Sequence, residues 1–229
     1  MKKPNIVVLI MCLTTFTLSS YAQTFEIKAG VNMSTMLFEN QGGTYSENFE
    51  LTPRFLLGAT TELPLSNSFS FEPGVFFSSS GYKIDSHYPV PTYSGEYIPI
   101  REQAILNYIE IPASLRLASS IKNIQLFGNI GPYLAIGLSG KVSRKEYRID
   151  GQEGVVYEGT IDYSGEIGND GQWKRFDYGF QAGIGVEVNR IVVRGNYKHG
   201  IANIAQDSGI KNKNRVFAIS LGYILGLKK

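Results

Sequence analysis

Short segments in which apolar and polar side chains alternate strictly recur along this chain. Residues 107–117, NYIEIPASLRL, place Ile111 and Leu115 on one face and Glu110 and Arg116 on the other. A period of two is typical of a β-strand with two unlike faces. In a soluble sheet the apolar face packs in the core, whereas in a membrane barrel it faces lipid. The choice between these folds determines which functions are open to the protein.

Eight such segments occur, separated by stretches rich in Gly, Asn, Ser and Pro. They are residues 25–33, 54–63, 69–78, 107–117, 124–140, 176–188, 191–200 and 215–227. Long connections (34–53, 79–104, 141–175 and 201–214) alternate with short ones (64–68, 118–123 and 189–190). Long surface loops alternating with tight periplasmic turns are typical of outer-membrane barrels. The sequence therefore predicts an all-β fold, an eight-stranded antiparallel up-and-down transmembrane β-barrel.

The polar faces of these segments are rich in glycine and hold both signs of charge. Their charged residues are Glu26, Lys28, Glu62, Glu72, Glu110, Arg116, Asp177, Glu187, Arg194 and Lys198. The apolar faces hold almost no charge, and their aromatic residues lie near strand ends, as in interfacial girdles. We therefore expect the apolar faces to contact lipid and the ten charged residues to form an interior polar network. Buried charges must pair, so this network either plugs the lumen or lines a narrow polar path.

The first 22 residues have the features of a secretory signal peptide. Lys2 and Lys3 precede a short apolar stretch, and small residues stand before the expected cleavage point. This leaves residues 23–229 as one outer-membrane barrel domain. Without Lys2 and Lys3 the 22 basic residues fall to 20, equal to the 20 acidic ones, so nothing indicates a nucleic-acid partner. The only cysteine, Cys12, lies inside the leader, so the mature chain has no thiol chemistry.

No residue pattern indicates catalysis, a cofactor or a metal. Asp85, Ser86 and His87 are triad residue types, but neighbours in a strand or loop point in different directions and cannot form a nucleophile–base–orienter chain. The glycine-rich segment 131–141 lacks the spacing of a phosphate loop. The acidic residues between 150 and 170 do not have EF-hand spacing, so a solvated acidic loop is favoured over a divalent-cation site.

Several segments resemble the PorT-like family of small outer-membrane β-barrel proteins, which is of the Bacteroidetes type. They include FEIKAGVNMS (25–34), YIEIPASLRL (108–117) and GNIGPYLAIGLSGK (128–141), in family order along the chain. The resemblance implies an eight-stranded barrel exported to the outer membrane, and it implies no activity. The chain departs from the usual barrel ending, because its last strand is followed by Leu227-Lys228-Lys229 rather than by an aromatic residue.

The four long connections make up close to half of the mature chain, which is more than strand closure needs. Tyrosines, which suit binding surfaces, are frequent in two of them: Tyr82, Tyr88, Tyr93, Tyr97, Tyr157 and Tyr163. We expect these residues to form a loop recognition surface for a protein or glycan. The predicted protein is a monomer in outer-membrane lipid with a non-enzymatic role in surface interaction or envelope support. The alternatives are a narrow small-solute channel and, less favoured, a soluble ligand-binding barrel or a barrel enzyme.

Overall fold

The computed structural model describes residues 24–40, 43–44, 49–89, 97–150, 154–165, 167–168 and 173–226. Its strands are β1 (Thr24–Asn40), β2 (Gly43–Thr44), β3 (Phe49–Glu50), β4 (Thr52–Pro64), β5 (Phe69–Pro89), β6 (Tyr97–Ile121), β7 (Ile124–Asp150), β8 (Gly154–Gly165), β9 (Phe176–Val188), β10 (Ile191–Gly200) and β11 (Lys211–Leu225). No helix in this part of the chain is long and apolar enough to cross a membrane. The predicted leader, residues 1–22, lies outside the described residues.

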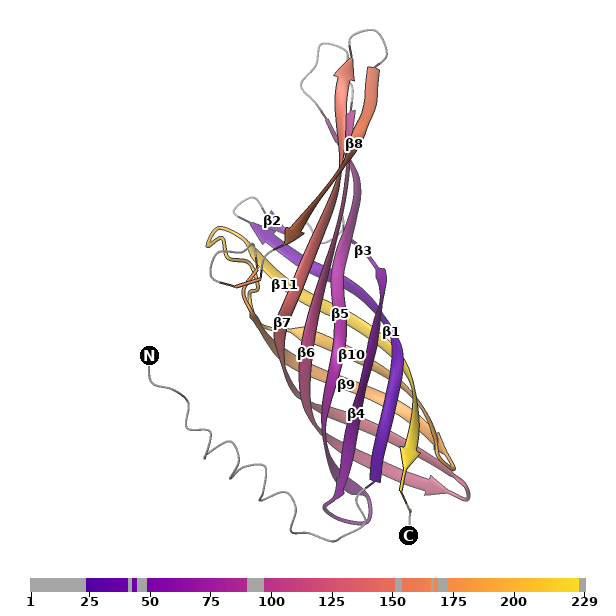
Figure 1. Ribbon diagram of the computed structural model, residues 1–229. Coiled ribbons are helices and arrows are strands. Elements are labelled where there is room, and N and C mark those ends of the chain that lie inside the picture. Colours follow the sequence, from indigo (N-terminus) through magenta and orange to yellow (C-terminus); the bar gives the residue numbers. More distant parts are fainter. Residues whose placement is uncertain are drawn as a thin grey trace.

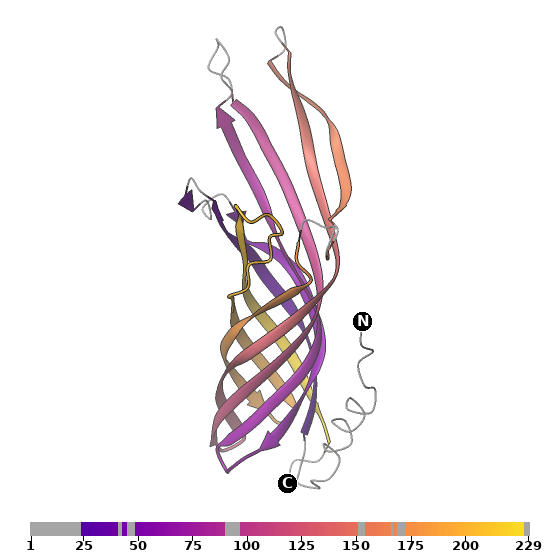
Figure 2. The ribbon, with the colours of Figure 1, turned by 90° about the vertical axis from the view of Figure 1, so that its left-hand side faces the viewer.

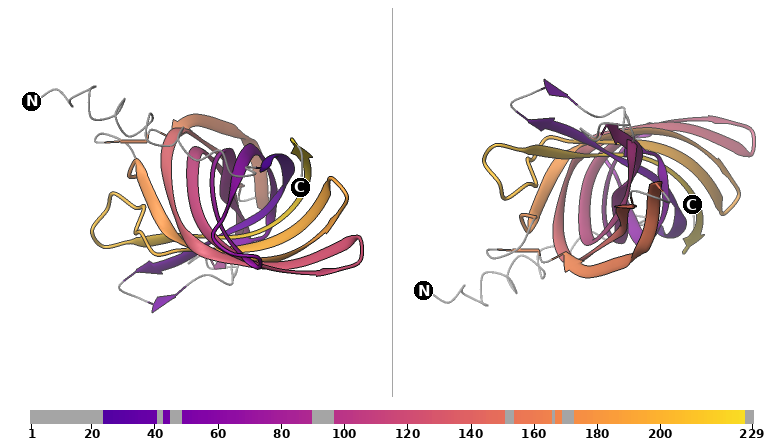
Figure 3. Two further views of the ribbon diagram at one scale, coloured as in Figure 1. Left: turned by 90° about the horizontal axis from the view of Figure 1, so that it is seen from below. Right: turned by 90° about the horizontal axis from the view of Figure 1, so that it is seen from above.

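Eight of these strands form a closed antiparallel ring, which confirms the predicted fold. The order around it is β1, β4, β5, β6, β7, β9, β10 and β11, and β11 pairs back onto β1. The closing register runs from Phe25 opposite Leu225 to Glu39 opposite Lys211. Figures 1 and 3 show the strands tilted around a common interior. Closure leaves the barrel wall without an unpaired edge, as a membrane-spanning sheet requires.

The two faces of the barrel wall have the inverse of a soluble protein's polarity. Ile111 is 42% exposed and Leu115 is 51% exposed, whereas Arg116, the residue after Leu115, is only 2% exposed. The same alternation follows β9 and β11 along their lengths. The apolar faces therefore point outward and the charged faces inward. A sheet with this polarity is stable only when lipid surrounds it.

The strands are much longer than the segments that predicted them. β5, β6 and β7 have 21, 25 and 27 residues. The prediction that 79–104 and 141–175 are loops is therefore wrong for most of their length, because β5 pairs with β6 as far as Pro89 and Tyr97. Figure 2 shows two hairpins, β5–β6 and β7–β8, projecting well past the rim of the barrel.

Residues 154–164, in which apolar and polar side chains also alternate, belong to a strand outside the ring. The fifth strand of the ring, β7, continues outward, and its partner there is this separate strand β8, with Asp150 opposite Gly154 and Gly140 opposite Gly165. The next strand along the chain, β9, is the sixth strand of the ring.

Candidate functional site

The interior of the barrel is arranged in polar layers, and the lowest surrounds Arg116 near the short turns. Its guanidinium contacts the carboxylate of Glu62 and donates to Glu187 Oε2 at 2.9 Å and to Gln125 Oε1 at 2.8 Å. These partners come from β4, β9 and β7, while Arg116 lies on β6. One buried cation thus links four strands, two of which, β4 and β9, are not neighbours of β6 in the ring.

Phe127 separates this layer from the next. The guanidinium carbon of Arg116 lies 4.0 Å from the centre of its ring, and that of Arg194 lies 4.7 Å from it. Cation–π contacts of this kind are strongest where both groups are desolvated, and Phe127 is only 4% exposed. Gly185 leaves room for the ring, because a Cβ there would lie 2.2 Å from Phe127 Cζ. The Arg116–Phe127–Arg194 stack closes the lumen at this level.

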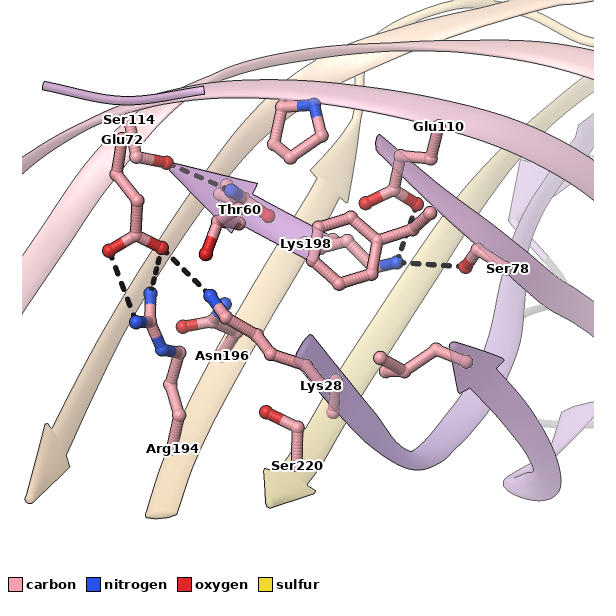
Figure 4. Close-up of a pocket in the computed structure, with 15 residues that line it drawn as sticks. Lys28, Thr60, Glu72, Ser78, Glu110, Ser114, Arg194, Asn196, Lys198 and Ser220 are labelled. Carbon is pink, nitrogen blue, oxygen red and sulfur yellow. Dashed lines mark hydrogen bonds and ion pairs between the residues drawn. The ribbon is translucent and has the colours of Figure 1, made fainter. Parts of the chain in front are cut away.

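The next layer is centred on Glu72, which accepts from two cations (Figure 4). Lys28 Nζ lies 2.8 Å from Glu72 Oε1, and Arg194 bonds both carboxylate oxygens, at 2.6 and 3.1 Å. Glu26 contacts the same two cations at 3.4 and 3.3 Å. Two acids and two bases therefore balance, which is the condition for holding charges out of water.

A small cavity of about 40 Å³ lies above Glu72. Polar side chains line it, among them Asn196, Gln181 and Ser114, with Gln181 Nε2 donating to Ser114 Oγ at 2.9 Å. A polar space of this size holds roughly one to three water molecules. On its far side Lys198 pairs with Glu110 at 2.7 Å. The cavity is too small for a solute to pass.

Asp177 lies further toward the long hairpins and differs from the other inward carboxylates. It accepts from Asn214 Nδ2 at 2.9 Å and from the hydroxyl of Tyr133 at 3.4 Å. Within the described residues it has no ion pair, whereas the five glutamates of the predicted network each contact a base. Both donors are neutral and both reach Oδ2, while the buried Oδ1 has no hydrogen-bond partner among the described residues.

An apolar cluster closes the barrel on the side of the hairpins. Its buried members are Met36, Tyr82, Ala104, Leu106, Tyr108, Tyr133, Ala135, Val142, Trp173, Ala202 and Ile204. The irregular segments 167–168, 173–175 and 201–210 reach into the mouth, where Lys174 N donates to Ile204 O at 2.7 Å. Asn203 holds residues 201–210 in shape, since its Oδ1 accepts from the backbone N–H groups of Ala205 and Asn212. We call this closure the lid.

The opposite end of the barrel is open. A polar funnel of about 460 Å³ lies between the short turns and ends at Glu62 and Glu187. Ser66, Ser70 and Gln125 are among the residues that line it. The funnel and the 40 Å³ cavity share no lining residue, and the Arg116–Phe127–Arg194 stack lies between them. The lumen is thus accessible from one side only.

The structure places all ten charged residues of the predicted network on the inward face. Nine of them are buried, and Glu62, at the funnel, is half-buried.

The tyrosines of the predicted recognition surface are not all exposed. Tyr82 is 8% exposed and donates to Glu102 Oε1 at 2.6 Å, so it cannot belong to an exposed recognition surface. Tyr93 lies outside the described residues.

The remaining tyrosines of the predicted surface have only their backbone described. Tyr88 and Tyr97 lie near the end of the β5–β6 hairpin, and Tyr157 and Tyr163 lie in β8. The acidic stretch 150–170 is likewise described only in part. Among the described residues no group of three or more His, Cys, Asp or Glu could hold a metal ion.

Sequence reasoning missed several interior residues. Phe127 and Tyr133 share the inward parity of Gln125 and Asn129, so the period of two could have identified them. Trp173 and Ile204 could not have been found in this way, because they lie in segments without a period.

Comparisons with solved structures give distant barrels. Ail, the attachment invasion locus protein of Yersinia pestis, solved with the heparin analogue sucrose octasulfate, is 13% identical over 89% of this chain and 99% of its own, with a TM-score of 0.39. Neisserial surface protein A (NspA) is 12% identical over 87% and 96%, with a TM-score of 0.41. The toluene transporter TodX of P. putida is 8% identical over 94% and 92%, with a TM-score of 0.29.

No curated protein matches the chain significantly. The family model described as "Outer membrane protein beta-barrel domain" matches residues 21–206, most of the chain. That match agrees with the closed ring, the outward apolar faces and the paired interior charges, and it gives the outer membrane as the location. The chain belongs to the outer membrane protein β-barrel domain family.

Proposed function

We propose that this protein is a non-enzymatic surface-interaction barrel, whose two projecting hairpins bind a protein or glycan outside the cell. The observation that supports this most is the contrast between the two parts of the molecule. The lumen is filled by paired side chains and capped by the lid, while β5–β6 and β7–β8 continue far beyond it (Figure 2). Binding sites are commonly found on segments that a rigid scaffold projects.

The base of the projecting sheet is tied together by ion pairs. Arg101 Nε donates to Asp85 Oδ1 at 3.0 Å within the β5–β6 hairpin. Arg144 of β7 donates to Glu102 of β6 at 2.7 Å. These contacts cross neighbouring strands, so they reinforce the backbone pairing of β5 with β6 and of β6 with β7 at this level. A preorganised surface loses less conformational entropy on binding than a flexible loop does.

Trimming the hairpins tests this proposal. Replacing residues 85–101 with a short Gly/Ser turn leaves Ile84 opposite Glu102 as the last pair. Replacing residues 145–160 leaves Arg144 opposite Ile161 and retains Ile167 and Trp173 for the lid. The full-length protein, in lipid nanodiscs, is applied to a glycan array and to an array of secreted and cell-surface proteins. We expect binding to a ligand on one array and its loss in the trimmed variants.

Heat-modifiable migration on gels provides the control, since both trimmed variants retain the complete ring and should still fold. Binding that persists at full strength in the doubly trimmed protein would place the recognition surface elsewhere. An absence of binding by the full-length protein on both arrays would contradict the proposal.

The alternative function is a narrow small-solute channel, and the open funnel is the one feature that favours it. Against it stand the Arg116–Phe127–Arg194 stack and the lid, which close the lumen at two levels. A conduction measurement therefore separates the two functions, and its expected outcome is given in the Discussion.

We also propose three finer assignments that accompany this function. The leader is removed after residue 22, the barrel is a monomer, and within its family the chain is PorT-like. The last rests on segments such as YIEIPASLRL (108–117). N-terminal sequencing of the protein purified from membranes tests the first, and its mass in a lipid nanodisc tests the second.

A further inference from the structure

The lipid-facing wall has a shallow trough of about 970 Å³ across β6, β7, β9, β10 and β11. Its outward side chains are aliphatic or aromatic, apart from two serines at its edge. Its outward, exposed side chains include Leu117, Leu126, Ile184, Val186, Val193 and Ile219. In an outer-membrane barrel this surface faces hydrocarbon, so an acyl chain is the natural occupant.

Two outward glycines create the depression. Gly128 of β7 and Gly195 of β10 each stand opposite Ile184 of β9 in the register. A Cβ built at Gly128 would meet its nearest atom at 3.7 Å, and one at Gly195 at 3.9 Å. By contrast, a Cβ at Gly58 would lie 2.3 Å from a backbone oxygen. Packing within the protein therefore does not require glycine at 128 or 195, although glycine weakens a strand.

Ile184 forms a ridge between the two depressions. At 75% exposure it is the most exposed large apolar side chain in the described part of the chain. The two glycines lie two strands apart, which is about 10 Å at the usual strand spacing. A lipid with two acyl chains can place one on each side of the Ile184 side chain, whereas a single chain fills only half of the surface.

Two exposed cations lie at the adjacent turns. Lys122 is in the β6–β7 turn, where it also lines the rim of the funnel, and Arg190 is in the β9–β10 turn. Neither forms an ion pair with a described residue. Because Ile124 lies opposite Val188, the two turns are neighbours in the wall, and a phosphate at this height would lie within reach of both flexible side chains, which attract anionic headgroups.

We propose that this trough retains one two-chain anionic phospholipid from the leaflet on the side of the short turns, with its chains astride Ile184 and its phosphate between Lys122 and Arg190. This inference is independent of what the hairpins bind. The ion-paired interior and the lid do not account for the glycines on this outer surface, and a lipid site does.

Native mass spectrometry of the full-length protein in detergent tests the site, with dioleoyl phosphatidylglycerol as the added probe. We expect a single tightly held lipid on the wild type. Gly128→Leu together with Gly195→Leu adds bulk to both depressions at positions where a Cβ meets no atom closer than 3.7 Å, and it should reduce retention to background. Lys122→Gln together with Arg190→Gln should weaken it by roughly tenfold or more, since two contacts of about 1 kcal/mol are lost.

Three controls make the result specific. Ala29→Leu adds the same side chain to the lipid-facing side of β1, outside the trough, and should retain the lipid. Phosphatidylcholine and a one-chain lysophosphatidylglycerol should both bind more weakly than the probe. Equal retention by the filled-trough variant, or no lipid above background on the wild type, would overturn the proposal. Disulfide-linked dimers of Ile184→Cys in native membranes would overturn it in favour of a second copy of the chain.

Discussion

At the scale of single residues, position inside the ring decides how much an ion pair contributes. Glu72 is 4% exposed and is shared by Lys28 and Arg194. Glu72→Gln leaves two buried cations with one carboxylate, and removing one partner of a buried pair costs about 3–5 kcal/mol. We expect a free energy of unfolding that is lower by this amount, measured by urea titration in lipid vesicles.

The matched control is Glu50→Gln. Glu50 pairs with Lys83 at 2.7 Å, a distance much like that between Glu72 and Lys28, but the side chains of Glu50 and Lys83 are both about half exposed. Water already solvates such a pair, so the loss should stay within about 1 kcal/mol. Equal effects of the two substitutions would show that the interior charges do not stabilise the barrel as the geometry indicates.

At the scale of elements, the sequence predicted the membrane-spanning part of each strand correctly. It did not predict that the strands continue beyond the membrane. Within the wall, lipid and lumen impose opposite requirements on alternate residues, so a period of two had to appear, as in residues 107–117. Above the rim water contacts both faces of the hairpins and the constraint disappears. The outer halves of β5, β6 and β7 therefore look like loops in the sequence, although they are paired strands.

The same distinction explains the candidate site. Parity identified which charges point inward, because each lies on a regular strand. It could not give their partners, because pairs such as Arg194–Glu72 join residues 122 positions apart. It also could not predict Trp173 in the lid, because the sequence around it has no period of two.

The orientation of these elements can be tested by labelling. A cysteine at Gly159, in β8, should react with a membrane-impermeant maleimide on intact cells, because the long hairpins face outward. A cysteine at Ser120, at the exposed end of β6 beside a short turn, should react only after the outer membrane is opened. If the Ser120 variant reacts on sealed cells, the short turns face outward, and the orientation is the opposite of the one expected here.

At the scale of the whole molecule, the lumen of the barrel is closed and does not form a continuous pore. The lid fills one mouth, the cavity below it has a volume of only about 40 Å³, and the Arg116–Phe127–Arg194 stack lies between that cavity and the funnel. We expect the purified wild-type protein to produce no stable unitary currents in planar bilayers, whereas a general diffusion porin reconstituted in parallel should conduct. Reproducible openings of uniform size would favour the channel instead.

The pairing of β1 with β11 also bears on how the protein is made. Phe25, near the start of the ring, meets Leu225, its last paired residue. Until β11 has been synthesised and exported, β1 has an unpaired edge whose backbone groups lipid cannot satisfy. A chain that stops short of Lys211 therefore does not yield a smaller barrel, and ribosomal products that end early should be cleared in the periplasm rather than accumulate in the outer membrane.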